Sequence, residues 1–88
     1  MKIEVRKPTA EELKTLGVLG WPTWTCAPST FDWSYSEPET CYLLEGQVTV
    51  EAGGQSVSFG KGDLVVFPQG LSCAWKVSQP VRKHYRFG

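Results

Sequence analysis

No stretch of this chain approaches the roughly 18–20 consecutive apolar residues that are needed to span a bilayer. The chain also lacks an excess of either charge sign, because nine lysines and arginines balance nine aspartates and glutamates. Proteins that bind nucleic acids normally carry a basic face for the phosphate backbone. We therefore expect neither a membrane segment nor a nucleic-acid partner.

Cysteine and histidine are scarce as well, with three cysteines and one histidine in the chain. An odd number of cysteines with no Cys-x-x-Cys pair does not suggest a disulfide framework. The first residues alternate as a strand does, which is unlike the apolar segment of a secretion signal. These features predict a reducing, cytoplasmic location.

Aromatic residues, by contrast, are abundant. The 88 residues include four tryptophans, three tyrosines and four phenylalanines, and each such ring buries roughly 150–250 Å². We expect a single domain, 1–88, which at this size buries only about 60–65% of its unfolded surface. Because small sheets often cover their edge strands with a second chain, we also expect a homodimer.

Alternating patterns and turn residues predict an all-β fold with one short helix. Thr9 and Glu12 have the spacing of a capping box, which predicts a helix from Ala10 to Leu16 that stops at Gly17. The expected strands lie at 3–5, 21–26, 31–35, 40–44, 47–51, 55–59, 64–67, 72–77 and 81–87. Short strands with turns at this spacing are typical of a small barrel or double-sheet jelly roll.

Two glycine-containing blocks are spaced as the motifs of a known barrel family. In the first block Glu39 precedes Gly46 by seven residues, and in the second Gly62 is followed by Pro68 and Gly70. This pattern resembles the cupin superfamily. The chain is similar to the small single-domain cupins of the DUF861 (Cupin_3) family, which are related to the cupin domain of (S)-ureidoglycine aminohydrolase. The resemblance implies a cupin double-stranded β-helix, that is, a jelly-roll barrel.

In metal-binding cupins, histidines and a glutamate converge on a divalent ion. The resemblance places Trp33, Tyr35 and Cys73 at the histidine positions and Glu39 at the glutamate position. An indole N–H can only donate, and one carboxylate with one thiol is not an ordinary zinc or iron site. We therefore predict no metal cofactor. An enzyme resembling the aminohydrolase, with metal if any, remains the alternative.

The resemblance also implies that Glu39 points into the barrel, so that side chains alternating with it share the interior. The inferred lining consists of Trp33, Tyr35, Glu39, Cys41, Cys73 and Trp75. Because aromatic faces attract cations, we expect this pocket to bind a small polar molecule of the amine or ureide type. The other interpretation is a structural or regulatory module whose barrel is packed by these side chains, as small barrels often are.

Glu39 and Cys73 are the candidate catalytic residues. A buried carboxylate needs a partner, for which the Tyr35 hydroxyl, the Trp33 indole or an arginine is available. Such a carboxylate suits a general acid or base. Cys73 and Cys41 are either inert buried thiols or a nucleophile or redox pair, which would need a nearby positive charge.

The end of the chain is locally basic. We expect an exposed strand face here, with a patch that attracts anions as the alternative, formed by Lys76, Arg82, Lys83, His84 and Arg86. For His84 we expect a surface or hydrogen-bonded position, and a role as metal ligand or in acid–base chemistry is the alternative.

Overall fold

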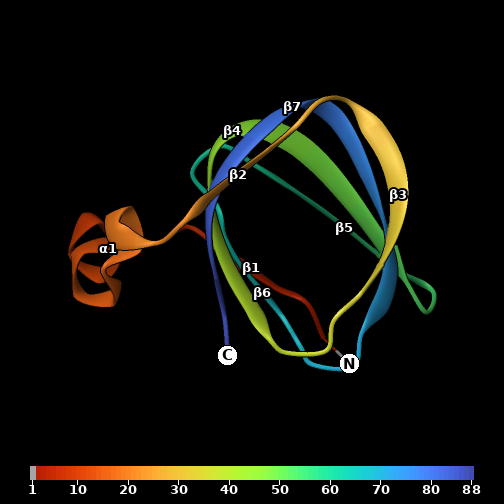
Figure 1. Cartoon of the computed structure of the whole chain (residues 1–88), viewed down its shortest axis with the longest axis horizontal. Coiled ribbons are helices and arrows are strands. Elements are labelled where there is room, and N and C mark those ends of the chain that lie inside the picture. Colours follow the sequence, from red (N-terminus) through yellow and green to blue (C-terminus); the bar gives the residue numbers. More distant parts are fainter. Residues whose placement is uncertain (1) are drawn as a thin grey trace.

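One strongly curled antiparallel sheet forms the body of the protein in this computed structural model, which describes residues 2–88 (Figure 1). The elements are β1 (Glu4–Arg6), α1 (Ala10–Leu16), the 3₁₀ turn η1 (Val18–Gly20), β2 (Thr23–Cys26), β3 (Ser29–Ser34), β4 (Glu39–Ala52), β5 (Gln55–Gly60), β6 (Leu64–Phe67) and β7 (Ser72–Phe87). Among the described residues, no helix is long and apolar enough to cross a membrane.

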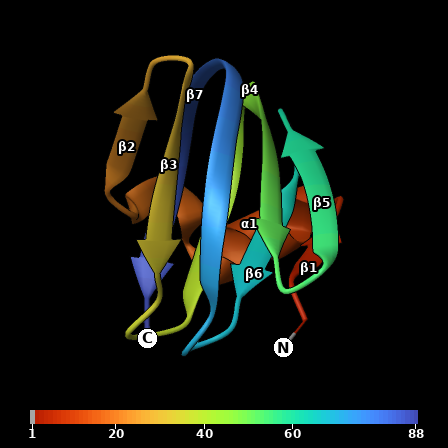
Figure 2. The ribbon, with the colours of Figure 1, turned by 90° about the vertical axis from the view of Figure 1, so that its right-hand side faces the viewer.

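The strand order explains how one sheet encloses an interior. The order is β1-β6-β4-β7-β2, with β3 also paired to β7 and β5 also paired to β4. The two long strands β4 and β7 therefore run through both sides of the barrel, and each exchanges neighbours halfway along its length. Figure 2 shows β3, β7, β4 and β5 side by side as one wall. The predicted small cupin barrel is confirmed.

Two expected breaks in the strands are wrong, because β4 and β7 each continue where the sequence predicted two strands. The register between β4 and β7 shifts between Leu43 and Val48, so Gly46 and Pro80 meet at an irregularity in the ladder. Proline lacks an N–H, but at such a bulge no ladder hydrogen bond is lost. Gly46 has φ +115°, and a Cβ there would lie 2.8 Å from the Pro80 carbonyl oxygen. Each strand continues through this close approach instead of ending.

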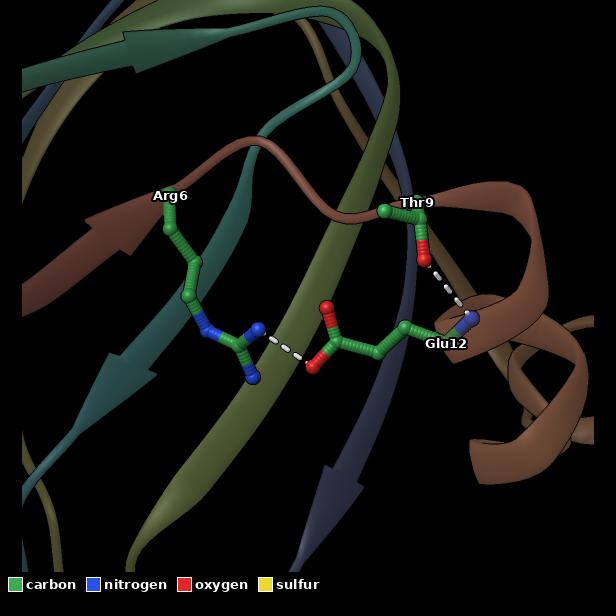
Figure 3. A network of polar contacts seen from close by, with 3 residues as sticks. All are labelled: Arg6, Thr9 and Glu12. Atoms are coloured by element: carbon green, nitrogen blue, oxygen red, sulfur yellow. Dashed lines mark hydrogen bonds and ion pairs between the residues drawn. The ribbon is translucent and has the colours of Figure 1, made fainter.

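The predicted helix is confirmed from Ala10 to Leu16. Thr9 Oγ1 accepts a hydrogen bond from the Glu12 backbone N–H at 3.1 Å, and Gly17 ends the helix with φ +70°. The carboxylate of Glu12 does not complete a capping box but binds Arg6 of β1 (Figure 3). The helix lies outside the barrel (Figure 1), and the η1 turn that follows it was not predicted.

The interior is only partly filled by side chains. Tyr35 stacks on Phe67 with ring centroids 4.9 Å apart, and Phe67 lies 5.5 Å from Trp75. Phe59 contacts both Phe67 and Trp75. These rings come from β5, β6, β7 and the segment after β3. Tyr35 and Trp75 also border a cavity next to β2 and β3.

Candidate functional site: an aromatic cavity with a buried ion pair

A cavity of about 480 Å³ lies between β2, β3, the start of β4 and the end of β7. Its lining residues are Trp24, Cys26, Phe31, Trp33, Tyr35, Glu39, Trp75, Lys83, Tyr85 and Phe87. Trp33 and Phe87 are 49% and 42% exposed, whereas Glu39 and Lys83 are only 3% and 5% exposed. The cavity therefore extends from an exposed aromatic rim to a buried charged end.

Strand alternation places these side chains on the inner face. Lys83, Tyr85 and Phe87 are alternate residues of β7, and all three line the cavity. Trp24 of β2 lies directly opposite Lys83, and Phe31 of β3 directly opposite Trp75. The rings of the second pair stack with centroids 5.9 Å apart. Two strands thus form one aromatic wall against β7.

Glu39 and Lys83 form an ion pair inside this cavity. Lys83 Nζ donates to Glu39 Oε2 at 2.8 Å, and the two side chains are 6% and 4% exposed respectively. The same nitrogen lies 4.8 Å from the ring centroid of Trp24 and 4.5 Å from that of Trp75. The negative face of an aromatic ring attracts a cation most strongly where water is excluded. The ammonium group is therefore held by one carboxylate and two indole faces.

Tyr35 connects this pair to the packed aromatic cluster. Its hydroxyl oxygen accepts a hydrogen bond from Trp75 Nε1 at 3.3 Å. Burial above all, and next the negative charge of Glu39, raise the pKa of Tyr35. The phenol consequently stays protonated beside the carboxylate.

The structure brings four of the six predicted lining residues to the cavity: Trp33, Tyr35, Glu39 and Trp75. The two predicted thiols do not line the cavity, whereas Cys26, which was not predicted, does. Cys41 is fully buried, and Cys73 is 8% exposed with its Sγ 3.6 Å from the Trp33 carbonyl oxygen. Burial raises the pKa of Cys41 to about 12 and also raises the pKa of Cys73. Because the thiolate is the reactive form, these shifts argue against a nucleophilic role.

The expectation for the basic stretch is wrong for two of its residues. Lys83 and His84 are buried, whereas Lys76 is exposed and pairs with Glu51 on the outer surface. His84 Nδ1 lies 2.9 Å from the Trp21 carbonyl oxygen, in agreement with a hydrogen-bonded histidine.

Lys83 was the functional residue that sequence reasoning missed, although a signal was present. From Val81 to Phe87, alternate residues are apolar except for Lys83. A single lysine on an apolar strand face needs a buried counter-charge, and Glu39 was already expected inside the barrel. The partner expected for Glu39 was an arginine or a neutral donor, and the structure supplies a lysine together with Tyr35.

These residues do not fit a metal ion. Within residues 2–88, no three histidine, cysteine, aspartate or glutamate side chains cluster closely enough to hold one. Glu39 is the family's ligand glutamate by position, but its carboxylate already binds the Lys83 ammonium. Lys83 thus gives Glu39 the positive charge that a metal ion would otherwise give.

Comparison with known proteins agrees with the fold. The sequence model of the EutQ-like cupin domain family matches residues 13–85 of this chain. A DUF861 family protein of Thermotoga maritima is 51% identical, with a TM-score of 0.97 over 99% of this chain and 100% of that protein. The EutQ protein of Clostridium difficile is 26% identical, with a TM-score of 0.69 over 74% of this chain and 52% of that protein.

A DUF861 family protein of Pseudomonas syringae is 29% identical, with a TM-score of 0.68 over 75% of this chain and 29% of that protein. The similarity thus spans about half of the EutQ protein and less of the Pseudomonas protein. No curated protein sequence matches the chain. The motif spacing, the curled sheet and these matches agree, and the chain belongs to the EutQ-like (DUF861) cupin family.

Proposed function

We propose that the cavity binds a small organic molecule with a flat apolar body and an amide or ureide head group, without a metal ion. The observation that supports this proposal most is the open aromatic cavity that ends on the Glu39–Lys83 pair. Its volume of about 480 Å³ lies within the range of small-molecule sites, about 300–1,000 Å³. A few polar groups in an apolar wall also have the usual composition of such sites.

The aromatic walls select the body of the ligand. Trp24 and Phe31 lie edge to face with centroids 6.2 Å apart, and Trp33 stands at the exposed rim. A planar apolar group packed against such rings gains both buried area and favourable ring contacts. A strongly hydrated ligand would gain little here, because most of the lining is carbon.

The charged end selects the head group. The expectation that this pocket binds a free amine loses support, since Lys83 already places a cation against Trp24 and Trp75. A second ammonium group would be repelled there. An amide or ureide has an N–H that can donate to Glu39 and a carbonyl oxygen that can accept from Lys83. It therefore complements both members of a net-neutral pair.

Thermal shift measurements test this proposal with phenylurea as the probe and benzylamine as the comparison. A ligand that binds only the native state must raise the melting temperature in proportion to the logarithm of its concentration. We expect phenylurea to give such a logarithmic increase and benzylamine a smaller one. Glu39→Gln should abolish the difference between the two, whereas Glu51→Gln, in the exposed pair with Lys76, should leave it unchanged. No shift with phenylurea at millimolar concentration would contradict the proposal.

Hydrolysis of a bound ureide, as the resemblance to ureidoglycine aminohydrolase suggests, stays a second hypothesis. One observation favours it, the Glu39 carboxylate at the buried end of the cavity, which is placed to act as a base. Release of ammonia from ureidoglycine by the purified protein would support it, and the absence of release at enzyme concentrations near that of the substrate would exclude it. The homodimer and the cytoplasmic location also stay predictions.

A further inference from the structure

We propose that Lys83 forms a covalent imine with aldehydes or ketones that enter the cavity, with Glu39 carrying the proton. This inference rests on the proposed function, because the carbonyl compound must reach the buried end of an open cavity. It goes beyond reversible binding in assigning a chemical reaction to one nitrogen atom.

Lys83 is placed as a reactive amine. Among the described residues that line the cavity, it carries the one amine, and the other lysines of residues 2–88 are exposed. Its side chain is 6% exposed, and its Nζ lies against the faces of two indole rings. A carbonyl group that accepts a hydrogen bond from this nitrogen is already at the distance from which the nitrogen attacks.

Glu39 supplies the base that an ammonium group needs before it can react. The two charged groups are 2.8 Å apart, so a proton can pass directly from Nζ to the carboxylate. The transfer leaves Nζ with the lone pair that attacks a carbonyl carbon.

The reaction balances with no further reagent. Nζ transfers one proton to Glu39, and its lone pair attacks the carbonyl carbon to form a C–N bond, while the C=O pair moves to oxygen. A proton then moves from nitrogen to that oxygen, which gives a carbinolamine. Glu39 returns its proton to the hydroxyl group, the C–O bond breaks, water leaves, and the nitrogen lone pair forms the C=N bond. The ammonium and the carbonyl compound become a protonated imine and water.

The site suits the product as well as the reactant. A protonated imine carries the same single positive charge as the ammonium that it replaces, so Glu39 remains paired. Trp24 and Trp75 can keep their contacts with that charge. The water that is formed leaves a cavity lined mainly by carbon, and its exclusion opposes hydrolysis.

Reductive trapping tests the proposal in the full-length wild-type protein. The protein is incubated with benzaldehyde and sodium cyanoborohydride at neutral pH, and the modified lysines are located by peptide mass spectrometry. We expect the peptide with Lys83 to be labelled at least about tenfold faster than the peptide with Lys76, because positioning raises the effective concentration of the aldehyde. Equal labelling of the two lysines, or labelling that spares Lys83, would overturn the proposal.

Lys76 is a matched control, since it lies on the same strand and pairs with Glu51 at the same 2.8 Å but is exposed. Glu39→Gln should slow labelling of Lys83 by at least about a hundredfold, the smaller end of the effect of a general base, and leave labelling of Lys76 unchanged. Unchanged labelling of Lys83 in this variant would remove Glu39 from the reaction. Phenylurea cannot form an imine, so its thermal shift tests the cavity separately from the covalent step.

Discussion

Replacement of Lys83 by methionine should destabilise the protein strongly, although methionine is a good core residue. The Glu39 carboxylate is 4% exposed, and its ion-pair partner in the structure is Lys83. Removal of one member of a buried pair leaves an uncompensated charge and costs about 3–5 kcal/mol. Methionine is also a long, unbranched and adaptable apolar side chain, so little of this loss comes from packing. In a domain of this size, the melting temperature falls by roughly 4–8 °C for each kcal/mol.

Guanidinium denaturation followed by tryptophan fluorescence measures this loss, and two further variants isolate its cause. Adding Glu39→Gln to Lys83→Met removes the buried charge, so most of the lost stability should return. Lys76→Met breaks a pair of the same 2.8 Å length whose side chains are 49% and 48% exposed. Such surface pairs contribute about 0–1 kcal/mol.

The refuting result is specific. A loss in Lys83→Met that is no larger than the loss in Lys76→Met would mean that Lys83 is not buried with Glu39. A double variant that is as unstable as Lys83→Met alone would mean that packing, and not the unpaired charge, dominates. Either outcome would remove the physical basis for the charged end of the cavity.

Four other outcomes are expected. Burial raises the pKa of Cys41 from 9.0 to about 12, so the stability contributed by its protonated thiol is complete below about pH 9 and is lost as the pH rises toward about 12. This loss lowers the unfolding free energy of the wild-type protein by up to about 1.4 kcal/mol per pH unit for one proton, and the decrease should be less steep in Cys41→Val. Gly46→Ala should lower the unfolding free energy by at least about 2 kcal/mol, because φ at Gly46 is +115° and the new Cβ would lie 2.7 Å from Val81 Cγ2. The control Gly20→Ala, whose Cβ meets nothing within 4 Å, should change it by no more than about 0.5 kcal/mol, and equal effects of the two variants in denaturant titrations would contradict the close approach of Gly46 to Val81. Trp33→Ala removes a ring that is 49% exposed and should weaken phenylurea binding roughly tenfold in titration calorimetry while the melting temperature hardly changes. Light scattering should give the mass of two chains, and the mass of one chain would exclude the homodimer.

The fold could be predicted because its signals are local. Gly46, Gly62 and Gly70 all have positive φ, which the sequence indicated through residues that permit such angles. The Thr9 cap and the Gly17 stop fixed the helix in the same way. The missed continuity of β4 and β7 was not local, since it depends on how Gly46 and the segment after Pro80 fit against each other across two strands.

The candidate site was predicted only in part. Alternation along the strands correctly grouped Trp33 with Tyr35, and it grouped Glu39 with Cys41 on the inward face. It could not tell which inward residues border a cavity and which are sealed in the core, because alternation assigns a face and not a depth. Cys41 is sealed, whereas Trp33 stands at the rim.

From its sequence alone, the chain determined a strand pattern and the motif spacing of a family, because glycine, proline and alternation act over a few residues. The resemblance to that family implied an inward carboxylate at position 39. Tertiary structure alone decided what that carboxylate meets. Lys83 is 44 residues away along the chain, and its charge reaches Glu39 only because β7 pairs with β4 within a curled sheet. Burial of a charge depends on such long-range partners, so composition could describe Lys83 only as one member of a basic stretch.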